Sequence, residues 1–270
     1  MSESTPISFL SDFGTDDEFV GVVHGVIARI APEVRVIDVT HGIPRGDVRA
    51  GALSLMRAIQ YLPEGVALAV VDPGVGTSRL PIAAETPWGY FIGPDNGLLS
   101  PAAAIVGGSI RVVTIENPEL VLPASGATFD GRDRFAPAAA VLASGQAELE
   151  DLGSPVSPDA IVPMVLPIPA VGDSSVEGEA WWVDAFGNVQ LNIGPDDLHE
   201  AGISIGAAVE VLVGPLKRRT LWARSYGDVD RGSPILHVDS TGMIALAVRE
   251  GSASEFFVLS TGGQVLLRSP

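Results

Sequence analysis

An acidic and a basic residue stand at the two ends of a glycine-rich turn. The stretch VVDPGVGTSR (70–79) places Asp72 directly after an apolar run and Arg79 beyond two glycines. Glycine permits backbone angles that let the chain double back or a ligand come close. A carboxylate beside a guanidinium could hold a small nucleophile, or it could be a structural ion pair, and spacing alone leaves both open. The turn lacks the Lys-Ser/Thr ending of a P-loop, which argues against a nucleotide-phosphate site.

Two further stretches concentrate acidic side chains. In SDFGTDDE (11–18), Asp12 could accept two hydrogen bonds from a ribose diol, and Asp17 could pair with an ammonium group. A competing interpretation, charges that cap the following helix, fits Asp12 least because Asp12 lies too early in the stretch. TFDGRDRFAP (128–137) places Asp130 among arginines, which by itself is typical of a helix N-terminus with surface ion pairs.

A fourth stretch, DAFGNVQLN (184–192), has the composition of a hairpin turn. It also has the side chains of an adenine site. The amide of Asn188 offers a donor beside an acceptor and could read an adenine edge, while Phe186 could stack on the ring. The residues leave both interpretations open.

Composition narrows the class of ligand. Acidic residues outnumber basic residues 33 to 16, for a formal charge of −17. Such a charge mainly serves solubility, but it repels phosphate backbones and favours a cationic small ligand, so nucleic acid is not expected as a partner. The chain has no cysteine, which excludes disulfides, thiolate metal sites and a cysteine nucleophile. The 4 histidines are scattered without ligand spacing, so no metal site is expected.

The ends and the apolar stretches indicate a soluble protein. The N-terminus has neither the basic region nor the apolar core of a signal peptide. The most apolar stretch, 160–171, is short and broken by prolines, so it cannot span a bilayer. We therefore expect a cytoplasmic protein without a membrane partner.

Alternating strands and helices would bring the acidic loops together. Apolar runs predict strands at 6–10, 34–39, 66–72 and near 110–115, and helical spacing predicts helices at 18–31, 47–61 and 134–144. This alternation predicts an α/β domain with a largely parallel, doubly wound sheet. Ligands bind such sheets beyond the carboxyl ends of the strands, where the acidic loops follow.

The pattern of predicted elements changes in the second half of the chain. We expect an N-terminal α/β domain over 1–160, a proline-rich linker over 161–175, and an all-β C-terminal domain over 176–270. Short apolar runs separated by turns predict a small barrel or sandwich for that last domain.

The motifs together resemble a known family. They occur in the order found in the S-adenosyl-L-methionine (SAM) hydroxide adenosyltransferases, SAM hydrolases related to fluorinase and chlorinase: SDFGTDDEFVG, DVTHGIPRGDVRAGA, VVDPGVGTSR, GPDNGLLS, TFDGRDRFAPAAA, DAFGNVQLNI and VDSTGMIALAV. The resemblance covers almost the whole chain. It implies an α/β domain, a barrel-like β domain and a homotrimer. Each site would lie between one subunit's N-terminal domain and its neighbour's C-terminal domain.

The resemblance also implies residue roles. By motif match, Asp12 stands where the family binds the ribose hydroxyls, and Asp17, Asp184 and Ser240 stand where it binds the methionine end. Asn188 stands where the family binds adenine, with Phe186 and Tyr226 on either side of the ring. Asp72 and Arg79 stand where it binds the water. The family places an Asp-Arg-His group around that water. Here TFDGRD replaces TFHGRD, so Asp130 stands where the family has histidine.

The reaction implied by the resemblance is hydrolysis of SAM to adenosine and L-methionine. A water would attack C5′ in line with the C–S bond, with no metal or organic cofactor. Two alternatives stay open. A halogenase would use the same substrate, but the family's halogenases lack the Asp72–Arg79 pair. A non-catalytic SAM- or adenosine-binding protein is kept open by Asp130.

Asp130 would add a second carboxylate near Asp72, which discourages formation of hydroxide. We therefore expect that Asp130 is not the main base. It either turns away to pair with an arginine or shares a proton with Asp72. Three arginines could compensate its charge: Arg79, Arg132 and Arg134.

Overall fold

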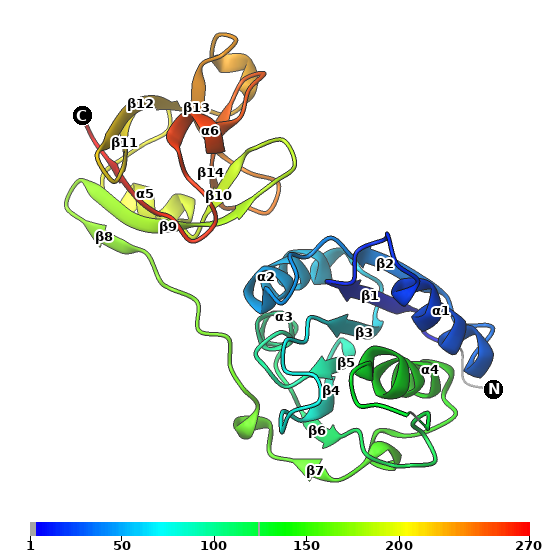
Figure 1. Cartoon of the computed structure of the whole chain (residues 1–270). Coiled ribbons are helices and arrows are strands. Elements are labelled where there is room, and N and C mark those ends of the chain that lie inside the picture. Colours follow the sequence, from blue (N-terminus) through cyan, green and yellow to red (C-terminus); the bar gives the residue numbers. More distant parts are fainter. Residues whose placement is uncertain (1–3, 124) are drawn as a thin grey trace. The chain divides into compact units, whose positions relative to one another are not determined.

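The structure is a computed structural model that describes residues 4–123 and 125–270. The chain divides into two compact units, Met1–Met164 and Val165–Pro270 (Figure 1). The division falls inside the segment expected as a linker, but both ends of that segment belong to folded units. Met164 donates its backbone N–H to a serine hydroxyl of the first unit. The short strand β8 (Ala170–Gly172) pairs with the second unit's sheet.

The first unit is built on a 7-stranded mixed sheet of order β2-β1-β3-β5-β4-β6-β7. The strands are β1 (Ile7–Ser11), β2 (Val36–Thr40), β3 (Gly65–Val70), β4 (Pro81–Thr86), β5 (Gly89–Pro94), β6 (Arg111–Thr114) and β7 (Pro155–Val156). Neighbouring strands from β2 to β5 in this order pair in parallel. The remaining neighbours, β5–β4, β4–β6 and β6–β7, pair antiparallel. The predicted fold class is confirmed, with the parallel strands grouped at one side of the sheet.

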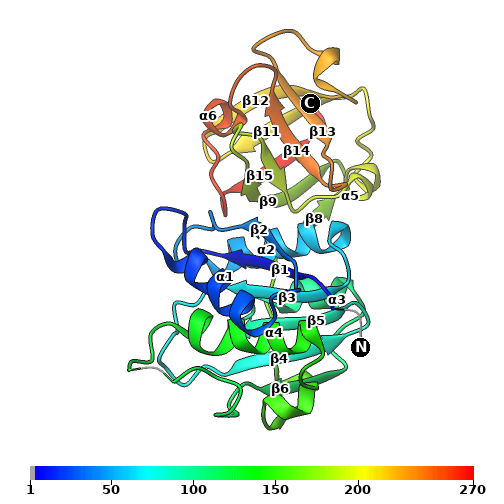
Figure 2. The same ribbon diagram turned by 90° about the vertical axis from the view of Figure 1, so that its right-hand side faces the viewer.

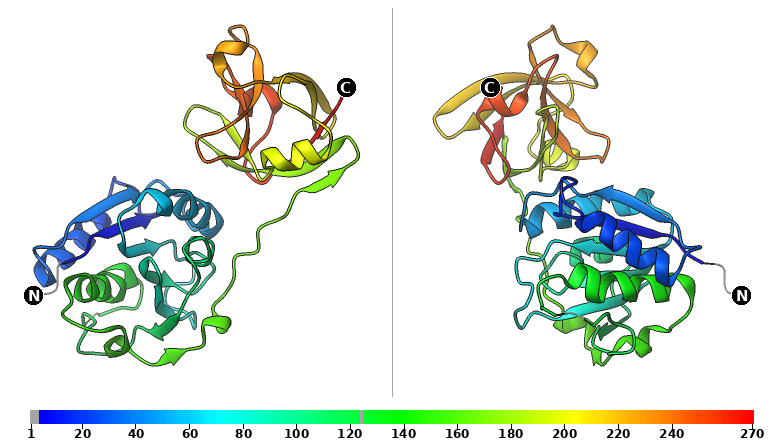
Figure 3. Two further views of the ribbon diagram at one scale, coloured as in Figure 1. Left: turned by 180° about the vertical axis from the view of Figure 1, so that it is seen from behind. Right: turned by 45° about the vertical axis from the view of Figure 1, so that its right-hand side comes forward.

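Helices cover both faces of this sheet. They are α1 (Phe19–Ile30), α2 (Val48–Ala58), α3 (Ser100–Ile105) and α4 (Ala136–Ser144), with the 3-10 turns η1 (Ile59–Tyr61), η3 (Leu149–Leu152) and η4 (Pro158–Ala160). Helices α1 and α4 lie side by side on one face and α2 and α3 on the other (Figure 2 and Figure 3, right). The buried apolar stripe of α1 packs with the strands into the main core, so helical periodicity predicted this element correctly.

The sequence predicts the N-terminus of helix α2 better than that of helix α4. Asp47 is the expected cap of α2, where its carboxylate accepts the N–H of Ala50. The helix expected at 134–144 begins as α4 at Ala136 and is preceded by the π-helix η2 (Gly131–Phe135). The N–H of Ala136 bonds the carbonyl of Gly131, five residues back, a pattern that often marks functional sites.

The second unit is a closed barrel. Its strands are β9 (Ser175–Val183), β10 (Val189–Leu191), β11 (Ala208–Val213), β12 (Leu216–Trp222), β13 (Pro234–Val238), β14 (Ile244–Val248) and β15 (Gln264–Arg268). They follow the order β10-β14-β13-β12-β11-β15-β9, and pairing of β9 with β10 closes the ring. The turns carry α5 (Pro195–Glu200), η5 (Tyr226–Asp228) and α6 (Ala253–Phe257). The barrel-like prediction is confirmed.

Within residues 4–123 and 125–270, no helix combines the length and the apolar character that crossing a bilayer requires.

Candidate active site

The first acidic residues meet where the order of the sheet reverses. The chain goes from β1 outward to β2 and then returns past β1 to β3, so the carboxyl ends of β1 and β3 form a topological switch point. Ser11 of β1 pairs in register with Val70 of β3. Asp12 and Asp72 follow these strands directly, so the fold brings both carboxylates to one edge.

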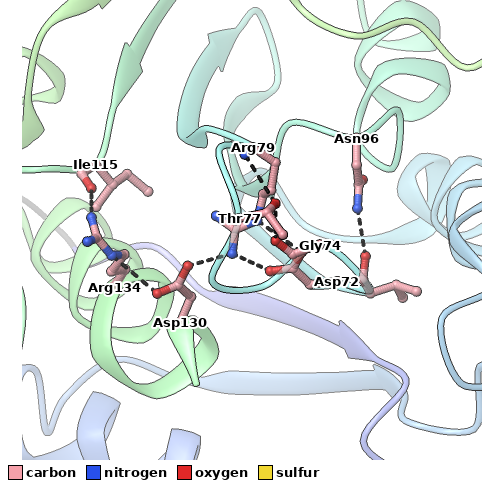
Figure 4. A network of polar contacts seen from close by, with 9 residues as sticks. Asp72, Gly74, Thr77, Arg79, Asn96, Ile115, Asp130 and Arg134 are labelled. Atoms are coloured by element: carbon pink, nitrogen blue, oxygen red, sulfur yellow. Dashed lines mark hydrogen bonds and ion pairs between the residues drawn. The ribbon is translucent and has the colours of Figure 1, made fainter. Parts of the chain in front are cut away.

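The turn after β3 returns Arg79 to Asp72. The backbone folds back through a bond from Thr77 N–H to the Gly74 carbonyl, and Gly76 has a φ of +77°, which favours glycine. The Arg79 Nε donates to Asp72 Oδ1 at 2.9 Å, and its Nη2 donates to Oδ2 (Figure 4). The amide of Asn96 steadies the strand end by donating to the Val71 carbonyl at 2.9 Å.

Asp130 completes the group from the start of η2. Its Oδ2 accepts from Arg79 Nη2 at 2.5 Å, and its Oδ1 lies 3.2 Å from Arg134 Nε (Figure 4). The segment reaches this place because Gly131 has no side chain: a Cβ there would lie 2.9 Å from the Phe13 ring. Asp130 thus pairs with an arginine, as one of its two expected arrangements has it, but it does not turn away, because it shares the Arg79 guanidinium with Asp72.

Burial strengthens these charge contacts. The side chains of Asp72, Arg79 and Asp130 are 6%, 10% and 13% exposed. Burial alone would lower the pKa of Arg79, but the hydrogen bonds and charges of the two carboxylates outweigh burial and raise it. Arg79 therefore keeps its positive charge, shared between two acids.

A small cavity opens beside this group. It measures about 60 Å³, and its described lining includes Asp12, Asp72 and Asp130, together with Phe13 and Phe129. A water molecule occupies about 30 Å³ in the liquid, so the cavity has room for a molecule of that size but not for a nucleoside. The described lining does not include Asp17, which is exposed. Asp12 Oδ2 accepts the Gly46 N–H at 2.8 Å, which orients the carboxylate.

A larger cleft lies in the second unit. It measures about 720 Å³, enough for a nucleoside, and is lined by Phe186, Asn188, Tyr226 and the segment 248–251. The structure thus brings together the three residues expected around adenine. Burial raises the pKa of Tyr226, and the nearby negative charges of Asp184 and Asp239 raise it further.

Asp184 organises one wall of this cleft. Its Oδ1 accepts the backbone N–H groups of Phe186 and Asn188 at 2.8 and 2.9 Å, and its Oδ2 accepts the Asn188 side-chain N–H at 2.8 Å. The stretch is therefore a hairpin turn, and two of its side chains, Phe186 and Asn188, line the cleft. The described lining of the cleft includes neither Asp184 nor Ser240.

Ser240 lies exposed in a turn that is held by its neighbour. Asp239 Oδ1 accepts from the backbone of Thr241 and of Met243, and Oδ2 accepts from Gln190 at 2.5 Å. This turn leaves Ser240 at the surface.

Sequence reasoning missed Arg249 and Glu250. Both line the cleft, and Glu250 has a φ of +61°, which is unusual for a residue with a side chain. Arg249 donates to the Val229 carbonyl at 2.7 Å, beyond the turn η5 that carries Tyr226. They are adjacent in the polar stretch REGSASE (249–255), whose composition is that of an ordinary turn, so the sequence provided no specific signal.

The expectation of scattered histidines is wrong for two of the four. His24 and His41 both bond Asp38 Oδ1 through Nε2, at 2.8 and 3.0 Å. The ligand atoms of the three residues lie within 4.8 Å of one another, so they could hold a divalent metal ion. Burial raises the pKa of Asp38, but the hydrogen bonds and charges of both histidines outweigh it and lower the pKa.

The same group supports the loop that carries Asp12. The Nδ1 of His41 lies 2.7 Å from the hydroxyl of Ser11, and the His41 carbonyl accepts the Gly14 N–H. Ser11 is fully buried, so the hydrogen-bonded residues Ser11, His41 and Asp38 cannot act on a substrate as a catalytic triad. Its hydrogen bonds instead fix the backbone on both sides of Asp12.

Comparisons with known proteins cover both units. Models described as the SAM hydroxide adenosyltransferase N-terminal and C-terminal domains match residues 7–153 and 178–266. A protein of Salinispora arenicola named (R)-S-adenosyl-L-methionine hydrolase is 44% identical over 97% of each chain. A fluorinase of Actinoplanes is 29% identical over 89% of this chain and 90% of its own. The crystal structure of an uncharacterized conserved protein from Thermotoga maritima has a TM-score of 0.90 at 37% identity, covering 97% of this chain and 99% of that one.

Proposed function

The chain belongs to the SAM hydroxide adenosyltransferase family, and from this premise we propose that it is an enzyme that hydrolyses SAM to adenosine and L-methionine. The observation that carries the proposal is the Arg79 guanidinium, bonded to Asp72 and Asp130 beside a cavity of about 60 Å³ at the switch point of the sheet. That cavity has the size and polarity to fix a water molecule.

The water is the difficult reactant, because it must lie in line with the C5′–S bond and lose a proton. Arg79 is not among the described residues that line the cavity, but its Nε and Nη2 bond the two carboxylates that do, Asp72 and Asp130. Its positive charge stabilises the hydroxide character that develops as the new bond forms. Asp72 orients the water and accepts its proton. Held positioning of this kind supplies up to about 7–11 kcal/mol in ideal cases.

The bond changes balance without a further reactant. The water oxygen forms the bond to C5′ while the C5′–S bond breaks, and the electron pair of that bond stays on sulfur. Methionine leaves as a neutral thioether, so no general acid is required. One proton is released. The negative field of a chain with a formal charge of −17 favours the cationic sulfonium substrate.

The remaining site residues hold the substrate in this proposal. Asp12 accepts the ribose hydroxyls, Asn188 reads the adenine edge, and Phe186 and Tyr226 flank the ring. Asp17, Asp184 and Ser240 hold the methionine end. The acidic side chains near the aromatic cleft suit the positively charged groups of that end.

The proposal includes a homotrimer with sites at subunit interfaces and a cytoplasmic location, both of which stay predictions. It also includes the configuration of the substrate. The Salinispora relative is named for the (R) form of SAM, and we expect this chain to prefer the (R) sulfonium as well.

The test is incubation with (R)-SAM or (S)-SAM, in buffers with and without chloride, followed by chromatography of the nucleosides. The proposal predicts adenosine in both buffers, formed faster from (R)-SAM. A halogenated nucleoside that forms only with chloride would indicate a halogenase. Binding of SAM without any product would indicate a binding protein.

A further inference from the structure

Asp130 lies between two guanidinium groups, not one. Its Oδ2 accepts from Arg79 Nη2 at 2.5 Å, and its Oδ1 lies 3.2 Å from Arg134 Nε. Acids and bases therefore alternate in one chain of contacts, Asp72–Arg79–Asp130–Arg134 (Figure 4). Arg134 comes one helical turn after Asp130, so the local backbone sets this pairing.

The charge of the group depends on Arg134. Asp72, Arg79 and Asp130 together carry two negative charges and one positive charge, and all three are largely buried. An excess negative charge beside the cavity would oppose the deprotonation of a water there. Arg134 brings the sum of the four side chains to zero.

Arg134 is itself anchored from a second direction. Its Nη1 donates to the Ile115 carbonyl at 2.9 Å, just after strand β6. Its side chain is 39% exposed, and the described lining of the cavity does not include it. Arg134 therefore acts on the cavity only through Asp130.

A neighbouring arginine provides a contrast within the same segment. Arg132 has the same exposed fraction, 39%, but its Nε and Nη2 donate to Asp133 at 2.6 and 2.9 Å. Its guanidinium also lies over the Phe129 ring, 5.1 Å from the centroid. Arg132 therefore pairs with Asp133 and does not compensate the negative charge of Asp130.

We propose that Arg134 is a positioning residue for the reaction: it neutralises and orients Asp130, so that Asp130 and Asp72 together fix the plane of the Arg79 guanidinium. The inference rests on the proposed function for its kinetic consequences, but the geometry of Arg79 is a consequence that does not depend on activity. Without Arg134, Asp130 would rotate or compete with Asp72 for Arg79.

The experiment compares Arg134→Gln, Arg134→Lys and the matched control Arg132→Gln in the full chain, with kcat and KM measured for SAM. We expect Arg134→Gln to lower kcat about 10- to 100-fold with KM changed by less than about twofold, because a catalytic group is misplaced while the substrate contacts remain. Arg134→Lys restores the charge and should recover most of the loss. Arg132→Gln should stay close to wild type, and circular dichroism verifies the fold of each variant.

A double variant tests whether Arg134 acts through Asp130. In an Asp130→Asn background the charge to be neutralised is gone, so Arg134→Gln should then cost less than about twofold in kcat. An equal loss in both backgrounds, or an Arg134→Gln variant as active as Arg132→Gln, would overturn the proposal.

A measurement on Arg79 separates this proposal from the proposed function. We expect the Nε–H resonance of Arg79 in a nitrogen-15 NMR spectrum to shift or broaden in Arg134→Gln and to stay unchanged in Arg132→Gln. An unchanged resonance in both variants contradicts the positioning role even if the wild-type chain turns over no SAM. An inactive wild type with a shifted resonance contradicts only the proposed function.

Discussion

Asp72 and Asp130 share one guanidinium unequally. Asp72 accepts from both Nε and Nη2 of Arg79, whereas Asp130 accepts from Nη2 alone. We therefore expect Asp72→Asn to lower kcat far more than Asp130→Asn, about 100-fold or more against about tenfold or less, the range usual for loss of an acid–base group. Asp130→His should keep or raise the rate, because a histidine adds no negative charge beside the cavity. Steady-state kinetics on SAM check the order of the three variants.

A different outcome has a clear meaning for this site. If Asp130→Asn is as damaging as Asp72→Asn while Asp130→His is inactive, Asp130 takes part directly in water activation. The chain would then use a water-activating group unlike the Asp-Arg-His group that its motifs resemble. Arg132→Gln, one residue from Asp133 and away from the shared guanidinium, serves as the control for local disturbance.

Asp12 is predicted to act in binding rather than in the chemical step. Its proposed bonds to the ribose diol are equally strong in the ground state and the transition state, so Asp12→Ala should raise KM about tenfold and leave kcat within about threefold. The substitution also removes the acceptor for the Gly46 N–H, so Asp12→Asn is the milder comparison. Measured kcat and KM decide the point: a collapsed kcat at constant KM assigns Asp12 to catalysis instead.

At the scale of elements, the charged face of the barrel makes stability depend on pH. The Lys217 hydrogen bond is the main cause that lowers the pKa of Glu210 to about 2 against the opposing effect of burial, and Arg268 and Arg219 lower it further. A lowered folded-state pKa stabilises the fold above the unfolded value of 4.5, and this stabilisation is lost as the pH falls toward about 2.

Glu210→Gln should therefore lower the melting temperature at pH 7 and have a much smaller effect near pH 2.5. Calorimetry of both proteins across this range is the measurement. Glu64→Gln is a suitable control, because Glu64 is an exposed acid of the first unit, whereas Glu210 lies in the second. A constant difference between wild type and Glu210→Gln at all pH values would show that the effect of Glu210 is not ionic.

The elements were predictable where the residue pattern alone decides them. The apolar periods of β1, α1, β2 and β3 lie within one or two residues of their observed bounds. The strands β1 and β3 are buried throughout and α1 buries one face, whereas the edge strand β2 is only half-buried. The proximity of Asp12 and Asp72 was predictable, because the carboxyl ends of parallel strands lie at the same edge of a sheet. The resemblance, rather than spacing, linked Asp130 to them.

Other features depend on contacts that no local pattern records. The π-helix η2 begins at Gly131, where the Phe13 ring leaves no room for a side chain. The cluster of His24 and His41 on Asp38 joins a helix, a strand and a loop. The use of Asp184 as a turn acceptor was hidden because a carboxylate can serve a ligand or its own backbone equally well.

At the scale of the whole molecule, charge should govern assembly. A subunit with a formal charge of −17 repels its copies, and salt screens this repulsion beyond about 8 Å at physiological ionic strength. We expect added salt to favour the predicted homotrimer and isolated subunits to be inactive. Sedimentation and activity, measured together over a range of salt concentrations, check this. A fully active monomer would exclude sites shared between subunits.

The proposed hydrolysis requires that this chain activate a water to attack C5′ of SAM. The most direct measurement is turnover in water labelled with oxygen-18, with EDTA present and no metal added, followed by mass spectrometry of both products. We expect adenosine that carries one labelled oxygen on C5′ and methionine that carries none. Unlabelled adenosine, a label in methionine, or activity that EDTA abolishes and a divalent ion restores would contradict it.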